Sequence, residues 1–134
     1  MSIQNQSITD KAMELLVFNP DGLIPAIAQQ HDTGEVLMMA WMNRQAIELS
    51  LAEKRAVYWS RSRQKLWRKG ETSGQIQHIK EIRWDCDGDT ILLQVEQVGV
   101  ACHTGRRSCF FYAIRDDKIK TISSPEIDPN DLYK

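Results

Sequence analysis

The three cysteines of the chain and one histidine are the residues whose types most directly indicate chemistry. Cys102 and Cys109 flank a polar segment that also contains His103, and Cys86 lies further toward the N-terminus. Thiolate and imidazole ligands favour Zn²⁺, and three protein ligands with one open position are typical of a catalytic zinc site. Burial of free cysteines in the core is the alternative, since no C-x-x-C pair is present. The cysteines all lie beside predicted turns, which favours zinc.

Three aspartates surround Cys86. If residues 85–87 are extended, Asp85 and Asp87 share one face, and Asp89 can return toward them because Gly88 permits a tight turn. Such an oxygen cluster suits Mg²⁺, and a plain acidic hairpin turn is the alternative. A calcium-binding EF-hand loop is excluded because its sixth position would be Thr90 rather than glycine.

A basic segment with two tryptophans covers residues 58–74. It holds five cations between Arg61 and Lys69 and continues into a short run of glycine and hydroxyl residues. Cationic side chains and closely approachable backbone amides are typical of a phosphate site. The candidate phosphate-binding residues are Arg61, Arg63, Lys69, Thr72 and Ser73. A solvated basic loop and an RNA-binding patch are alternatives, although no RNA-binding motif accompanies the segment.

Composition limits the classes of protein that can carry these segments. The chain has 134 residues, which favours one domain over residues 1–134, and its formal charge of -1 argues against non-specific nucleic-acid binding. The longest apolar run is residues 36–42, far below the ~20 residues that span a membrane. Residues 1–7 have neither a basic nor an apolar region, so we do not expect a secretory signal. An odd number of cysteines favours a cytoplasmic protein over a secreted disulfide scaffold.

The elements that must position these residues form an α+β domain dominated by antiparallel sheet, with one or two helices. The pattern predicts a helix over 11–16, capped from residues 7–10, and a second helix from its N-cap Asn43 to about Arg55. Pro25 confines its strand to a sheet edge or a strand start. Alternation places Ile76, His78, Ile82 and Trp84 on one face of their strand. The predicted strands are 23–29, 35–42, 56–60, 76–84, 90–98 and a final buried strand, 109–114.

Together the three segments resemble the phosphoribosyl-AMP cyclohydrolase family. The matching motifs are Ser60-Arg-Ser-Arg63, Leu66-Trp67, Lys69-Gly-Glu-Thr-Ser-Gly74, Asp85-Cys-Asp87 with Asp89, Ala101-Cys-His-Thr-Gly105 and Ser108-Cys109. The similarity covers about residues 23–112, which leaves 113–134 as a C-terminal surface tail. Val100 departs from the family, which often has proline there. Fused members of the family carry a pyrophosphohydrolase domain after this one, and we do not expect that activity in so short a tail.

The resemblance implies a cytoplasmic homodimer with two shared metal sites and no nucleic-acid or membrane partner. Cys86 of one subunit would bind zinc with Cys102 and Cys109 of the other, giving one Zn²⁺ per subunit. Asp85, Asp87 and Asp89 would bind Mg²⁺.

The implied reaction opens the adenine ring of 1-(5-phosphoribosyl)-AMP at the N1–C6 bond, the third step of histidine biosynthesis, with water as nucleophile. His103 is the candidate for proton transfer. The alternative is that His103 is the fourth zinc ligand. A zinc-stabilised RNA-binding module is the alternative function, and a closed site with four protein ligands would favour it.

Overall fold

The computed structural model describes residues 7–132. The expectation that the N-terminus is not a secretory signal falls on residues 1–6 and so lies outside the described residues. Within the described residues, the chain forms one six-stranded sheet in the order β4-β3-β2-β1-β6-β5, and a separate hairpin. The strands of the larger sheet are β1 (Ile24–Gln30), β2 (Val36–Met42), β3 (Val57–Ser60), β4 (Lys65–Arg68), β5 (Gln77–Trp84) and β6 (Ile91–Gln97).

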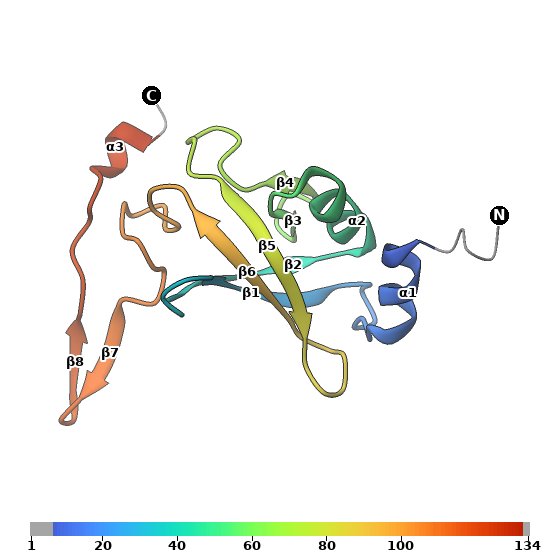
Figure 1. Ribbon diagram of the computed structural model, residues 1–134. Coiled ribbons are helices and arrows are strands. Elements are labelled where there is room, and N and C mark those ends of the chain that lie inside the picture. Colours follow the sequence, from blue (N-terminus) through green and yellow to red (C-terminus); the bar gives the residue numbers. More distant parts are fainter. Residues whose placement is uncertain (1–6, 133–134) are drawn as a thin grey trace.

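The larger sheet is mixed rather than purely antiparallel. Its only parallel pair, among the strands described, is β1 with β6, where Ala26 pairs with Ile91; every other neighbouring pair runs antiparallel. The sheet is strongly curled (Figure 1). Because of this curl, the start of β5 contacts the segment that connects α2 to β3. There the Ile79 amide donates to the Lys54 carbonyl oxygen at 2.9 Å. The chain is thus a single α+β domain, as expected, with one parallel pair inside the sheet, next to the edge strand β5.

Two capped helices follow the sequence-based expectation. Helix α1 (Ile8–Leu15) begins after Ser7, whose Oγ accepts a 3.0 Å hydrogen bond from the Asp10 amide. Helix α2 (Arg44–Glu53) begins after Asn43, whose Oδ1 accepts from the Ala46 amide at 2.8 Å. Each cap satisfies an amide that has no partner within its helix. A third, four-residue helix, α3 (Pro129–Leu132), was not predicted.

The hydrophobic core is formed by residues of β1, β2, β3 and β6 together with α2. Alternate residues of β1 and β6 are buried, including Ile24, Ala26, Leu93 and Val95. Pro25 is the second residue of β1, and the pairing of β1 with β6 begins only after it, at Ala26, so proline fits inside this interior strand. No helix among the described residues is long and apolar enough to cross a membrane.

Four details of the sequence prediction are wrong. The basic segment is not all loop, because Lys65–Arg68 forms β4 against β3. The final strand is not 109–114 and is not buried: β7 (Tyr112–Arg115) is mostly exposed and pairs with β8 (Lys118–Thr121) within the supposed tail.

In β5, a bulge at Lys80 shifts the register, so Ile79 and Ile82 both pack on the core while His78 is exposed. The extended conformation considered for residues 85–87 does not occur, because Cys86 and Asp87 already lie in the turn that contains Gly88.

Candidate active site

A cleft of about 740 Å³ opens beside β2 and β4. It is bounded by the loop that follows β4 and by the loop that follows β6. Its lining residues include Arg63, Lys69, Thr72, Ser73, His103 and Cys109, all of which the sequence analysis selected. Clefts of this volume suit a small-molecule ligand, and convergent polar groups on the walls give such sites their specificity. The structure thus brings together residues from two segments that are thirty or more positions apart in the chain.

Two of the three cysteines lie close together beside this cleft, and Cys109 lines it. Cys102 is buried, and Thr104 Oγ1 donates to its Sγ at 3.0 Å. The Cys109 amide donates to the Leu37 carbonyl oxygen at 2.7 Å, which fixes the second thiol beside β2. Burial, together with the neighbouring Cys102, raises the pKa of the Cys109 thiol to about 12. Cys102 is buried and Cys109 is exposed, and two thiols this close are a donor set that a thiophilic cation such as Zn²⁺ would convert to thiolates.

Lys69 lies deeper than a phosphate-binding lysine usually does. It is 6% exposed, and its Nζ donates to the Ala101 carbonyl oxygen at 2.8 Å. Burial lowers the pKa of the Lys69 ammonium, and the nearby thiols of Cys109 and Cys102 oppose that change. The side chain therefore ties the loop after β4 to the backbone beside Cys102, and its charge is directed toward the thiol pair.

The two candidate phosphate-binding arginines, Arg63 and Arg61, lie at different sites. Arg63 lines the cleft with Lys65, at the turn between β3 and β4. Arg61 does not: its guanidinium lies 4.8 Å from the centre of the Trp41 ring, over a smaller hollow formed with Trp59 and Gln64. Of the five candidate phosphate-binding residues, four line the cleft and Arg61 lies outside it.

The backbone of the loop after β4 requires glycine at its start. Gly70 has φ +82°, and a Cβ there would lie 2.5 Å from the backbone of Gln75 and Ile76. The chain therefore folds back tightly on itself between β4 and β5, which presents Thr72 and Ser73 to the cleft.

The three aspartates gather at the turn between β5 and β6. One carboxylate oxygen from each of Asp85, Asp87 and Asp89 lies within 4.8 Å of the others. Burial opposes ionisation of Asp85, but hydrogen bonds, including those from the Asp89 and Thr90 amides, lower its net pKa. Hydrogen bonding with Asp85 and Asp87 raises the pKa of Asp89. The three carboxylates are therefore close enough to share one hard divalent cation, and the Mg²⁺ assignment stays a prediction.

Cys86 does not join the other two cysteines within one chain. It lies in the turn before β6, whereas Cys102 and Cys109 lie in the loop after β6, so the seven-residue strand separates them. Seven extended residues span about 20 Å, and Figure 1 shows the two loops at opposite ends of the strand. The groups of three metal-ligating side chains among residues 7–132 accordingly contain no cysteine. A zinc site with all three thiols therefore needs a second chain.

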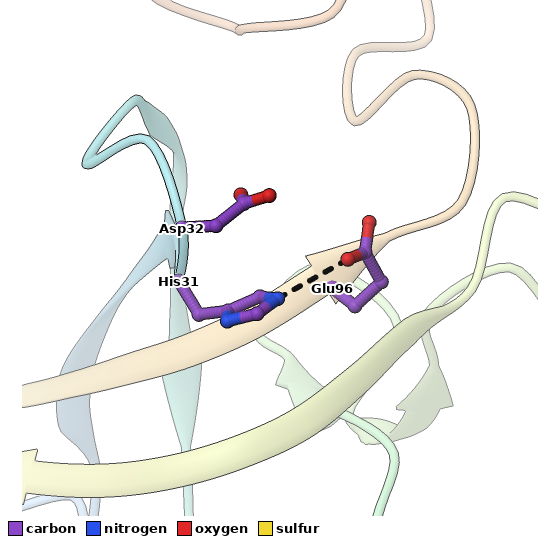
Figure 2. A group of neighbouring side chains, drawn as sticks. All are labelled: His31, Asp32 and Glu96. Atoms are coloured by element: carbon purple, nitrogen blue, oxygen red, sulfur yellow. Dashed lines mark hydrogen bonds and ion pairs between the residues drawn. The ribbon is translucent and has the colours of Figure 1, made fainter.

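One cluster of titratable side chains was not found from the sequence (Figure 2). His31 Nε2 lies 3.2 Å from Glu96 Oε1, and Asp32 completes a group from the β1–β2 turn and β6. The buried Gln30 amide donates to both carboxylates, at 2.9 Å to Asp32 and 3.1 Å to Glu96. The hydrogen bond from Gln30 lowers the pKa of each carboxyl. Pairing of β1 with β6 creates this cluster, so spacing along the chain gave no signal for it.

Other residues of the cleft were also missed. Met38, Met39 and Ala40 of β2 form one wall. In the sequence they belong to an apolar run that is typical of a core strand. Met39 is 40% exposed, and partial exposure of an apolar residue is visible only once the strand is placed.

The cleft, with its thiols, imidazole and cations, has the chemistry of an enzyme active site for an anionic substrate. Residues 38–111, more than half of the chain, match the family described as Phosphoribosyl-AMP cyclohydrolase. A protein of that name from Rhodospirillum centenum is 66% identical over 118 residues, which are 88% of this chain and 89% of the relative. A relative of the same name from Alkalilimnicola ehrlichii is 63% identical over 88% of this chain and 83% of its own length.

The chain therefore belongs to the phosphoribosyl-AMP cyclohydrolase family, and it is a hydrolase. This confirms the resemblance that the three sequence segments indicated.

Proposed function

We propose that this enzyme hydrolyses 1-(5-phosphoribosyl)-AMP and so opens the adenine ring, in the third step of histidine biosynthesis. The observation that supports the substrate most directly is the composition of the cleft, where Cys109, His103 and Arg63 line one cavity. The first two residues suit hydrolysis, and the arginine suits a phosphate. The names and identity of the relatives support the same substrate.

The electronic structure of the substrate favours attack at C6. The ribosyl group on N1 withdraws electron density from the ring, so C6 is electrophilic before any catalyst acts. Water adds to C6, the N1–C6 bond breaks, N1 leaves as the amidine nitrogen, and C6 becomes a carboxamide. The protein must orient the ring, remove a proton from water and return one to N1.

Cys102 and Cys109, with Cys86 of the partner subunit, would hold zinc in a homodimer. When bound, Zn²⁺ acts as a Lewis acid that lowers the pKa of water. The close thiols of Cys102 and Cys109, the first buried and the second exposed, suit this ion, and a site shared between two chains would take its third thiol from the other chain. Asp85, Asp87 and Asp89 would hold Mg²⁺, which would screen a phosphate or orient water.

His103 lines the cleft beside this cysteine pair and would carry protons between water and N1. Arg63, Thr72 and Ser73 would bind phosphate. The buried Lys69 would add positive charge to the same cleft. The proposal places this role in a homodimer in the cytoplasm, as the resemblance to the family implies.

A steady-state assay with phosphoribosyl-AMP tests the proposal. The wild-type enzyme should turn over, lose activity on chelation and regain it when zinc is returned. Cys109→Ser should lose both bound zinc and turnover, because a serine hydroxyl is a poor replacement for a thiolate. A Cys109→Ser enzyme with full zinc and full turnover would contradict the proposed site.

His103→Ala separates the two roles of the imidazole. Loss of turnover with zinc retained supports proton transfer, whereas loss of both supports a zinc ligand. His78→Ala, at an exposed position on β5 that does not line the cleft, is the matched control and should leave both unchanged.

A further inference from the structure

The β7–β8 hairpin carries an apolar face that its own chain leaves uncovered. Ile114 pairs directly with Ile119, and Tyr112 lies two residues from Ile114, so the three side chains share one face. Their exposed fractions are 80%, 83% and 71%. Figure 1 shows the hairpin projecting away from the larger sheet. An isolated two-stranded hairpin is at best marginally stable in water, so this one needs a surface to pack against.

A groove of about 370 Å³ lies on the opposite side of the molecule, between α1, α2 and β5. Its walls are mostly apolar, with Leu15 and Trp84 among the side chains that are substantially exposed. The apolar lining residues are Ile8, Ala12, Leu15, Leu16, Ile47, Leu51, Ile79, Ile82, Trp84 and Ile91. The hairpin cannot reach this groove within its own chain, because the body of the sheet lies between them (Figure 1).

The charges at the ends of the two features are complementary. Lys11, Lys54 and Lys80 line the groove together with one acidic residue, Glu81. The turn of the hairpin consists of Asp116 and Asp117, with φ +53° and +62°. Two carboxylates at the tip of the hairpin would therefore meet an excess of lysines. The basic residues of the hairpin, such as Lys118 and Lys120, alternate with the apolar ones and lie on its other face.

The groove and the hairpin also lie next to the two halves of the proposed zinc site. The turn that holds Cys86 packs on the end of α1, where the Val17 amide donates to the Gly88 carbonyl oxygen at 2.7 Å. The hairpin starts three residues after Cys109. If Cys109 of one chain approaches Cys86 of another, the first chain's hairpin begins beside the second chain's groove.

We infer that the β7–β8 hairpin of each chain packs its apolar face into the α1–α2–β5 groove of a second copy. Two-fold symmetry makes the exchange reciprocal, with two hairpins and two grooves per dimer. The inference adds a docking surface to the homodimer of the proposed function and rests on that homodimer for its position beside Cys86. The hairpin's four-residue strands, about 13 Å long, are shorter than the stretch of β5 that lines the groove, residues 79–84, and so can lie along it.

Photo-cross-linking tests the docking without relying on activity or zinc. A benzophenone amino acid replaces Ile119 in full-length protein, and the protein is mixed and co-refolded with ¹⁵N-labelled wild type. We expect interchain cross-links to peptides from α1, α2 or β5, in both zinc-loaded and chelated samples. The same probe at Asp21, an exposed turn residue, should give no such links. Links within one chain, or to any other surface, would overturn the inference.

Sedimentation equilibrium gives a second measurement. Because Ile114 and Ile119 are exposed in the single chain, Ile114→Lys with Ile119→Lys should fold yet raise the dimer dissociation constant at least tenfold. Leu15→Lys in the groove should do the same, and Lys118→Ala with Lys120→Ala should not. An unchanged dissociation constant in the two-lysine variant would refute the docking. Cys86→Ser separates the docking from the proposed zinc site. If this variant loses zinc and turnover but still dimerises, the docking stands independently of the zinc site.

Discussion

Cys86 and Cys102 lie beyond opposite ends of the same strand, β6. The strand between them has seven extended residues and is about 20 Å long, so the two thiols belong to loops at opposite ends of it. The loop that holds Cys102 also carries Cys109, and the turn that holds Cys86 carries the three aspartates. The candidate metal ligands are thus divided into two sets on a rigid scaffold. A shared site between two chains follows from this division more simply than from any rearrangement of the sheet.

Arg63 and Arg61 form a matched pair for testing phosphate binding. Arg63 lines the cleft, whereas Arg61 stacks over Trp41 outside it. Arg63→Ala should cost roughly 1.5–3 kcal/mol of transition-state stabilisation, as for a hydrogen bond to a charged group. That cost corresponds to a loss of kcat/KM of roughly 10- to 150-fold. Arg61→Ala should change kcat/KM much less. Equal kinetics for both variants, or a larger loss for Arg61→Ala, would count against the cleft as the phosphate site.

Gly88 fixes the turn that carries Cys86 and the aspartates. It has φ +74°, and a Cβ there would lie 2.4 Å from the Leu15 carbonyl oxygen. Gly22 has a similar φ of +76° but open space around it, so it is the matched control. In chemical denaturation, Gly22→Ala should lose about 1 kcal/mol of unfolding free energy from backbone strain alone. Gly88→Ala should lose a further ~1–3 kcal/mol because backbone must shift. Equal losses would show that α1 does not constrain the turn.

The environment of Glu96 predicts that part of the free energy of unfolding is lost at low pH. The hydrogen bonds from Gln30 and then His31 lower the pKa of Glu96 below its ordinary value of 4.5. The folded state therefore binds this proton less readily than the unfolded state. The stabilisation is fully present above the unfolded pKa and is lost as pH falls through the lower, folded pKa.

Urea unfolding at fixed protein concentration measures this component. Glu96→Gln should be less stable than wild type at pH 7, and the difference should shrink as pH falls below about 4.5. Glu126→Gln, at an exposed position, controls for the loss of one carboxylate. A difference between Glu96→Gln and wild type that stays constant from pH 7 to pH 3 would contradict the account.

Local chemistry made part of this structure predictable from the sequence. Ser7 and Asn43 cap the two main helices as expected, because a side-chain oxygen before a helix satisfies an amide within three residues. The site segments were also recognised, since thiols, carboxylates and cations carry their chemistry in their residue types. The cleft brings four of the five expected phosphate-binding residues together.

The elements that were missed depend on distant contacts. Lys65–Arg68 is basic and short, and it becomes a strand only because β3 is available to pair with it. The bulge at Lys80 leaves no trace in the alternation of β5. Tyr112 and Ile114 form the pattern of a buried strand, yet both are exposed in one chain. A pattern of apolar residues indicates burial but does not say which molecule provides the cover.

Subunit mixing tests the shared site most directly. Cys86→Ser and Cys109→Ser homodimers should each be inactive, because every site lacks one ligand. When equal amounts are co-refolded, half of the dimers are mixed, and in each of these one site collects both defects while the other collects none. Activity should therefore recover to about 25% of wild type. If all three thiols came from one chain, every site would carry a defect, and no activity would return after mixed dimers had been confirmed by mass spectrometry.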